Sequence, residues 1–356
     1  MTMRAFVYQP LQTRVVFGDG TLARLPEEVE RLGLHRVLVL STAAQAGEAE
    51  RVRAMMADAC AGTFTDAAMH TPVTVTDEAM ALVRSAGVDG VVAIGGGSTT
   101  GLGKAIAWRT DLPQIVIPTT YAGSEMTPIL GETENGVKTT RSSPRILPET
   151  VIYDVALSRG LPPGLSATSG LNAIAHAVEA LYARDRNPII DLMAEEGVRA
   201  LAAALPDIAA DPDDGEARAQ ALYGAWLCGC CLGAVGMALH HKLCHTLGGS
   251  FDLPHAETHA VVLPHALAYN GPAVAPAMAA LRRALGTDDP ARALFDLAGT
   301  LGAPQSLRGL GMPDDGIDRA VDLAMANPYW NPRPLDRAAL QATLRRAWQG
   351  APPAAA

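Results

Sequence analysis

In the first third of the chain, the spacing of apolar positions alternates between the pattern of strands and the pattern of helices. Short aliphatic runs of the strand type occur at 36–40, 89–94 and 114–120, and segments with helical spacing lie at 48–59 and 77–87. Strands and helices that take turns at this spacing predict βαβ units. We therefore expect a parallel sheet with helices on both faces.

The pattern changes after residue 158. An Asn-Gly turn within 133–138 predicts a hairpin beside the sheet, and a last extended segment ends at Asp154. Beyond it the chain is rich in Ala and Leu with helical spacing, and we expect prolines to end its helices. These prolines are Pro162, Pro206, Pro212, Pro254, Pro264, Pro290 and Pro304. The sequence predicts an α/β domain over residues 1–160 and an all-helical domain over 161–356.

Composition excludes several classes of partner. The 356 residues carry a formal net charge of −9 without a basic run, which disfavours nucleic acid and anionic lipid. No leader segment or long apolar span is evident, so we expect a cytoplasmic protein. The cysteines are five, and three of them crowd at 228–231 without disulfide or zinc spacing, which indicates buried thiols in a reducing compartment.

A glycine cluster follows the predicted strand 89–94. Gly95, Gly96, Gly97, Ser98 and Thr99 lie between the strand and a helix, where free amides and the helix dipole favour phosphate. The cluster is not the G-x-G-x-x-G fingerprint, and helix-to-strand packing is the alternative explanation. Its place at the carboxyl edge of a parallel sheet favours a dinucleotide diphosphate.

Hydroxyl groups follow the next strand. Thr119, Thr120, Tyr121 and Ser124 lie where they could contact the diphosphate, ribose or nicotinamide, although turn chemistry explains Ser and Thr equally well.

Histidines are concentrated in the helical half, and six of nine fall between residues 240 and 265. Asn172 and His176 share one helix face, as do His241 and His245, and His255 follows a glycine-containing turn. Three explanations stay open: a divalent metal site, a metal-free site that binds an anion and moves protons, or core hydrogen bonding. Core hydrogen bonding is the better explanation for His240, His259 and His265 individually.

These motifs resemble the iron-containing alcohol dehydrogenase superfamily, whose architecture is dehydroquinate synthase-like: a Rossmann-like dinucleotide-binding domain followed by a helical domain. The likeness runs from residues 17–33 through GGGST, PTT and the Asn172 helix to residues 240–270. In metal-dependent members, the positions of Asn172, His176, His241 and His255 hold Fe(II) or Zn(II), with Asp in place of Asn. An amide oxygen is a poorer metal ligand than a carboxylate, so the resemblance predicts a site without a metal.

The chain looks most like the maleylacetate reductase branch of that superfamily. That branch shares Asn at position 172, the strings GGGSTTGLGKAIA, TTYAGSEMT, HHKLCHTLGG, PHAETHA and NPYWNPRP, and Gly101 where alcohol dehydrogenases have Asp. The resemblance implies reduction of the carbon–carbon double bond of maleylacetate to 3-oxoadipate by NADH or NADPH in aromatic-compound breakdown. It also implies a homodimer.

The implied chemistry assigns roles to several residues. We expect His241, His245 and His255 to supply hydrogen-bond donors or the proton, and His176 and Asn172 to orient the substrate. Lys242 is the first candidate for a substrate carboxylate, Arg141 and Arg145 are weaker ones, and Tyr329 is a candidate phenolic donor or a packing residue.

Two other functions are weighed against this one. The first is a metal-dependent alcohol dehydrogenase, in which Asn172 or a water completes the metal site. The second is a catalytically silent nucleotide-binding protein, which the histidines disfavour. The residues after strand 36–40 do not distinguish NADH from NADPH.

Overall fold

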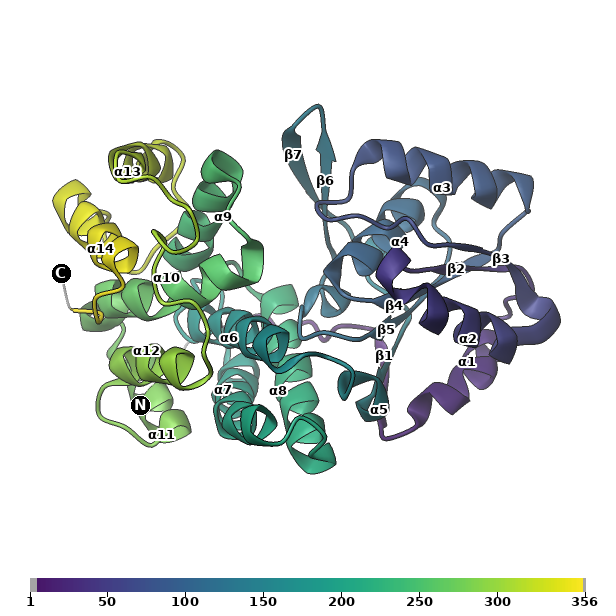
Figure 1. Ribbon diagram of the computed structural model, residues 1–356, viewed down its shortest axis with the longest axis horizontal. Coiled ribbons are helices and arrows are strands. Elements are labelled where there is room, and N and C mark those ends of the chain that lie inside the picture. The colour runs from purple at the N-terminus through teal and green to yellow at the C-terminus, as the bar shows by residue number, and fades with distance from the viewer. Residues whose placement is uncertain (1–4, 355–356) are drawn as a thin grey trace. The chain divides into compact units, whose positions relative to one another are not determined.

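The computed structural model describes residues 5–354, which form two compact units, each considered separately (Figure 1). One unit spans Leu11–Leu161. The other spans Pro162 to the C-terminal end and also includes residues 5–10. The chain thus changes unit between residues 161 and 162, one residue after the predicted boundary.

A six-stranded parallel sheet forms the centre of the first unit, in the order β1-β8-β5-β4-β2-β3. The strands are β1 (Arg14–Gly18), β2 (Val37–Leu40), β3 (Cys60–Phe64), β4 (Gly90–Gly95), β5 (Gln114–Pro118) and β8 (Thr150–Asp154). The predicted parallel sheet is confirmed. The strand pattern indicated β2, β4, β5 and β8 but not β1 or β3.

Helices cover both faces of this sheet. They are α1 (Leu25–Arg31), α2 (Ala46–Met56), α3 (Val73–Ser85), α4 (Gly97–Thr110) and the single turn α5 (Val155–Ser158). Alternate residues of each strand point to opposite faces. Val39 of β2 packs in one core cluster with α1 and α2, whereas its neighbour Leu40 lies against Gly103 of α4.

The predicted hairpin is also present. Strands β6 (Ile129–Glu134) and β7 (Val137–Ser142) pair antiparallel around Asn135 and Gly136, whose φ angles are 51° and 76°. Asn and Gly tolerate these left-handed angles, which explains the tight turn.

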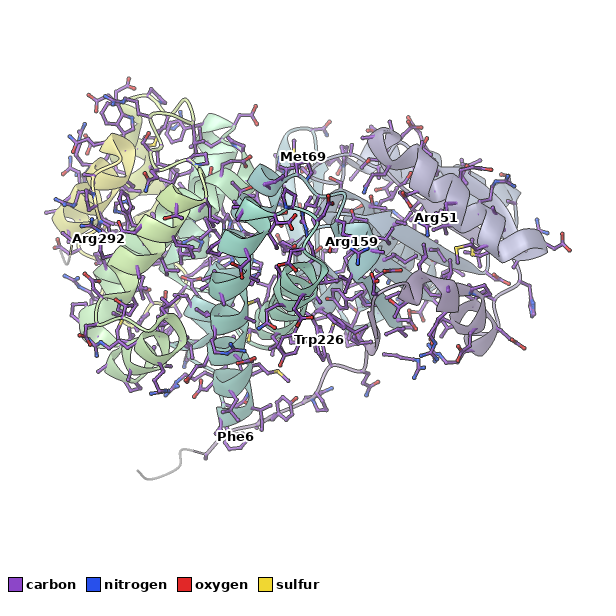
Figure 2. All side chains as sticks on the ribbon, turned by 60° about the horizontal axis from the view of Figure 1, so that its bottom comes forward. Phe6, Arg51, Met69, Arg159, Trp226 and Arg292 are labelled. Atoms are coloured by element: carbon purple, nitrogen blue, oxygen red, sulfur yellow. The ribbon has the colours of Figure 1, made fainter. Side chains whose placement is uncertain are left out.

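The second unit is helical. Its helices are α6 (Pro163–Ala180), α7 (Pro188–Ala210), α8 (Gly215–Ala234), α9 (Leu239–Phe251), α10 (His255–Asn270), α11 (Ala275–Leu285), α12 (Pro290–Thr300), α13 (Gly316–Ala326) and α14 (Arg337–Gln349). A core cluster joins α9, α10, α13 and α14. Ahead of these helices, Phe6, Val7 and Tyr8 lie exposed on an extended segment, where Figure 2 labels Phe6.

Two of the predicted helix breaks are wrong. Pro206 lies inside α7 and Pro264 lies inside α10, although an interior proline costs a helix about 3 kcal/mol. Every residue of α10 from Thr258 to Asn270 is buried. Burial on this scale outweighs the missing hydrogen bond, a tertiary effect that local sequence does not show.

Candidate active site

The glycine loop connects β4 directly to α4. Gly95 has a φ of 150°, and a Cβ atom there would lie 2.5 Å from Thr99 Oγ1. Gly96 precedes the first helical residue, Gly97, and no side chain caps this helix end. The first amides of α4 are therefore available to an anion, as the sequence predicts.

Unpartnered hydroxyl groups surround this helix start. Thr99 Oγ1 and Ser124 Oγ are buried and have no hydrogen-bond partner among residues 5–354. Ser124 Oγ is 3.9 Å from the Cβ position of Gly97, and the Thr120 side chain is 3.1 Å from that of Gly96. Bare amides beside unsatisfied hydroxyls fit the diphosphate of a dinucleotide.

The remaining hydroxyls of this segment are placed differently. Thr119 Oγ1 accepts a hydrogen bond of 2.7 Å from Gln45 Nε2, a contact that the sequence did not reveal. Tyr121 is fully buried in the core of the unit. The structure thus groups Ser98, Thr99, Thr119, Thr120 and Ser124 at the sheet edge, and leaves Tyr121 a packing role.

In the helical unit, three helices bring the predicted histidines together. Asn172 and His176 lie on α6, His241 and His245 on α9, and His255 at the start of α10. The ring centroids of His176 and His241 are 5.2 Å apart, and those of His241 and His245 are 6.0 Å apart. His255 joins through His259, whose ring is 4.3 Å from that of His255 and 5.0 Å from that of His241.

Glu179 organises this cluster, and the sequence analysis missed it. The carboxyl group is fully buried and accepts hydrogen bonds from the backbone N–H groups of Ala238 and His240, at 2.8 and 2.7 Å. His241 Nδ1 donates a third, at 2.7 Å. This contact fixes the imidazole of His241 and directs Nε2 away from Glu179.

Three polar atoms of the predicted site residues in this unit lack partners among the described residues: Asn172 Oδ1, His176 Nδ1 and His241 Nε2. The neighbouring His240 Nδ1 and His259 Nε2 lack them as well. Each of these residues is at most 4% exposed. Burial lowers the pKa of His176 well below its ordinary value, so this ring stays neutral. Unsatisfied buried groups are costly, and a cluster of three indicates a place where a ligand binds.

The amide oxygen of Asn172 makes this donor set a weak one for a divalent metal. Asn172 offers a neutral amide oxygen where a carboxylate would offset charge. Within residues 5–354, the group of His and Cys atoms close enough to share an ion, all within 4.8 Å, is instead His240, Cys244 and His259.

That second group is a hydrogen-bonded pair with a thiol beside it. His240 Nε2 and His259 Nδ1 lie 3.0 Å apart, and Cys244 Sγ is 3.7 Å from His240 Nε2. Burial lowers the pKa of both histidines well below the ordinary value, so they stay neutral. A shared proton accounts for the contact, in agreement with core hydrogen bonding for His240 and His259.

Lys242 and His245 of α9 form a more accessible group with Tyr329, which lies between α13 and α14. His245 Nδ1 is 3.0 Å from the phenol oxygen of Tyr329, and Lys242 Nζ lies 5.7 Å from the centre of the Tyr329 ring. Tyr329 is 39% exposed, so its hydroxyl is not confined to packing. The structure therefore brings together the predicted residues Lys242, His245 and Tyr329.

The two weaker arginine candidates are engaged elsewhere. Arg141 pairs with the buried Glu132 at 2.8 Å, and Arg145 pairs with Asp111 at 2.9 Å. Both belong to the α/β unit.

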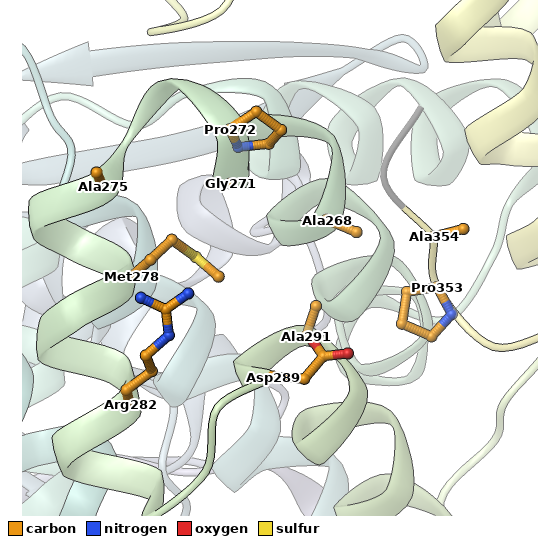
Figure 3. A pocket seen from close by; sticks show the side chains of 10 residues that line it. All are labelled: Ala268, Gly271, Pro272, Ala275, Met278, Arg282, Asp289, Ala291, Pro353 and Ala354. Carbon is orange, nitrogen blue, oxygen red and sulfur yellow. The ribbon is translucent and has the colours of Figure 1, made fainter.

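A separate pocket of about 440 Å³ lies beside α11 and α12 (Figure 3). Its lining includes Met278, Arg282 and Asp289 among mainly apolar residues. None of the predicted site residues lines it.

A glycine loop suited to a dinucleotide and a buried imidazole site are the features of a nicotinamide-dependent oxidoreductase. Residues 12–155 match the family described as iron-containing alcohol dehydrogenase, and residues 166–348 match its C-terminal domain. The chain belongs to the iron-containing alcohol dehydrogenase family, as its motifs suggested.

Similar proteins carry a more particular name. Maleylacetate reductase of Rhizobium sp. (strain MTP-10005) is 60% identical, with 99% of this chain and 100% of the relative covered. Maleylacetate reductase of Sphingobium indicum is 56% identical over 98% and 99% of the two chains. The crystal structure of maleylacetate reductase from Agrobacterium tumefaciens matches with a TM-score of 0.96 at 60% identity, covering 99% and 100%.

Among the described helices, none alone has the length and apolar character to cross a bilayer. Helices α8 and α9 reach that threshold only as a pair, and the chain bends by 92° between them.

Proposed function

We propose that this protein is a maleylacetate reductase, which uses NADH or NADPH to reduce the carbon–carbon double bond of maleylacetate to 3-oxoadipate. The observation that carries the proposal is Asn172, a buried amide with an unpartnered Oδ1 among buried imidazoles. The family resemblance implies a carboxylate at this position in metal-dependent members. Relatives of that name are 51–60% identical over nearly the whole chain. We place the enzyme in the cytoplasm as a homodimer that acts on a small dicarboxylate.

The α/β unit binds the cofactor in this proposal. Gly95, Gly96, Gly97, Ser98 and Thr99 hold the diphosphate through the amides of α4, and Thr119, Thr120 and Ser124 add hydroxyls. When bound, the reduced nicotinamide supplies a hydride to the β carbon of the substrate.

In this proposal, the helical unit stabilises the negative charge that hydride transfer creates on the substrate. Glu179 accepts the Nδ1–H of His241 and so orients this imidazole as the proposed general acid. His241 then donates to the enolate oxygen or protonates the α carbon. His255 acts in the same cluster, and His176 and Asn172 hold the substrate through neutral hydrogen bonds.

The group of Lys242, His245 and Tyr329 contacts the charged end of the substrate. Lys242 binds a carboxylate, and His245 with Tyr329 supplies further donors. Two carboxylates on the substrate make an additional acid at position 172 or 101 unfavourable, in agreement with Asn172 and Gly101.

The test is consumption of NADH, followed by its near-ultraviolet absorbance, with freshly generated maleylacetate. Chelator-treated protein, untreated protein and protein with added Fe(II) or Zn(II) are compared. We expect equal turnover in all three. Turnover that needs added metal would identify a metal-dependent dehydrogenase, and NADH binding without any turnover would identify a silent nucleotide-binding protein.

A further inference from the structure

Lys104 is a buried cation with no role in the sites described above. It lies on the second turn of α4, is 1% exposed, and is among the largest fully buried side chains of the described chain. A buried lysine is rare unless something stabilises its charge.

Oxygen atoms from one short segment surround its ammonium group. Lys104 Nζ donates to the backbone oxygens of Ser124, Thr127 and Ile129, the last two at 2.6 and 2.9 Å, and to Thr127 Oγ1 at 2.8 Å. All these acceptors lie between β5 and the start of β6. An ammonium group has three donors and no acceptor, so an all-oxygen environment fits the charged form.

A buried acid lies near this ammonium group. Burial lowers the pKa of Lys104 to about 7, and the attraction of Glu125 opposes that shift. Glu125 is itself buried, which raises its pKa, and it accepts a hydrogen bond of 2.8 Å from Tyr153 Oη. The segment itself has little regular structure, since residues 119–128 contain only the short 3-10 turn Ser124–Met126. Lys104 thus holds this segment through several hydrogen bonds from one ammonium group.

Ser124 connects the hydrogen bonds of Lys104 to the glycine loop at the start of α4. Its carbonyl oxygen accepts from Lys104, and its unpartnered hydroxyl lies near Gly97, the first residue of α4. Both ends of this link lie on α4, at Gly97 and Lys104, about two helical turns apart.

We propose that Lys104 is a positioning residue for the dinucleotide: it holds the segment 124–129 so that Ser124 Oγ faces the diphosphate at the start of α4. The inference rests on the nucleotide-binding part of the proposed function and not on the identity of the reduced substrate. Lys104 acts through Ser124 and does not touch the cofactor.

The test is the dissociation constant of NADH, measured by its fluorescence, in Lys104→Met, Thr127→Val and the wild type. We expect Lys104→Met to raise the constant by about tenfold or more, and Thr127→Val, which removes one of the acceptors, by a smaller factor. Arg109→Met is the matched control, because Arg109 lies on the same helix and pairs with Glu132, away from the loop. It should change the constant by less than about twofold.

A purely structural role predicts another result. It would lower the melting temperature of Lys104→Met while folded protein bound NADH as the wild type does, and that result would overturn the proposal. If Lys104→Met does not fold, an unchanged constant for Thr127→Val overturns it instead. If wild-type protein binds NADH but reduces no maleylacetate, the substrate assignment fails and this inference stands.

Discussion

Glu179 fixes the position of His241 in the histidine cluster. Its carboxyl group receives two backbone N–H groups at the start of α9 and the Nδ1–H of His241. The histidine cluster therefore depends on Glu179, a side chain to which we assign no direct contact with the substrate.

Replacing Glu179 by Gln should lower turnover by roughly 100-fold or more, because an amide has one acceptor oxygen and cannot hold all three N–H groups that the carboxylate accepts, including the Nδ1–H of His241. Steady-state kinetics with saturating maleylacetate measures the change. Glu196→Gln, an exposed acid on α7 paired with Arg199, is the control. Turnover of Glu179→Gln close to that of wild type would contradict the role given to His241.

The spacing of residues along α6 contains a signal for Glu179. Asn172, His176 and Glu179 are spaced i, i+4 and i+7, which places them on one face of α6. The Asn172 and His176 pair was recognised, but an acid within an Ala-rich helix looks like a surface residue until its burial is known.

At the scale of elements, α4 packs against a strained turn. His70 and Thr71 have φ angles of 62° and 47°, which are uncommon for residues other than glycine and costly for a β-branched one. A Cβ atom at Gly101 would overlap Thr71 Oγ1. Packing against Thr71 therefore favours Gly at position 101.

We expect Gly101→Ala to lower the free energy of unfolding by about 1–3 kcal/mol through overpacking. Gly47→Ala is the matched control, because Gly47 is an exposed helical glycine on α2 with open space around its Cβ position. It should be neutral or stabilise by up to about 1 kcal/mol. Urea denaturation compares the two, and equal effects would show that Thr71 does not restrict position 101.

Elements were predictable where local pattern and burial agree. Strands β2, β4 and β5 are continuous apolar runs, whereas β3 reads CAGTF and is mostly half-buried, so it has no clear signal. Pro206 and Pro264 mislead for the opposite reason, since packing of a whole helix overrides one residue. Lys104 was hidden in the same way, because its partners are backbone oxygens of a distant segment.

For the whole molecule, buried neutral histidines couple folding to pH. Burial and the nearby Arg346 lower the pKa of His265 from 6.5 to about 4. The unfolded chain therefore binds a proton that the folded chain does not between about pH 6.5 and pH 4. Stability from this group is present above that window and is lost as pH falls through it.

His265 alone should cost about 2 kcal/mol between about pH 7 and pH 5. Urea midpoints at both pH values test this for wild type, His265→Gln and the exposed control His35→Gln. We expect His265→Gln to lose less stability on acidification than the other two proteins. An identical loss in all three would show that His265 does not contribute.

A single base change can replace Asn172 by aspartate and so alter the chemistry of the histidine cluster. Its unpartnered Oδ1 lies on the same helix face as His176 and Glu179. Both codons for asparagine become codons for aspartate by one A-to-G transition at the first base. A single replication error can therefore place a negative charge among these imidazoles, and natural variants at this codon would show whether selection favours the amide.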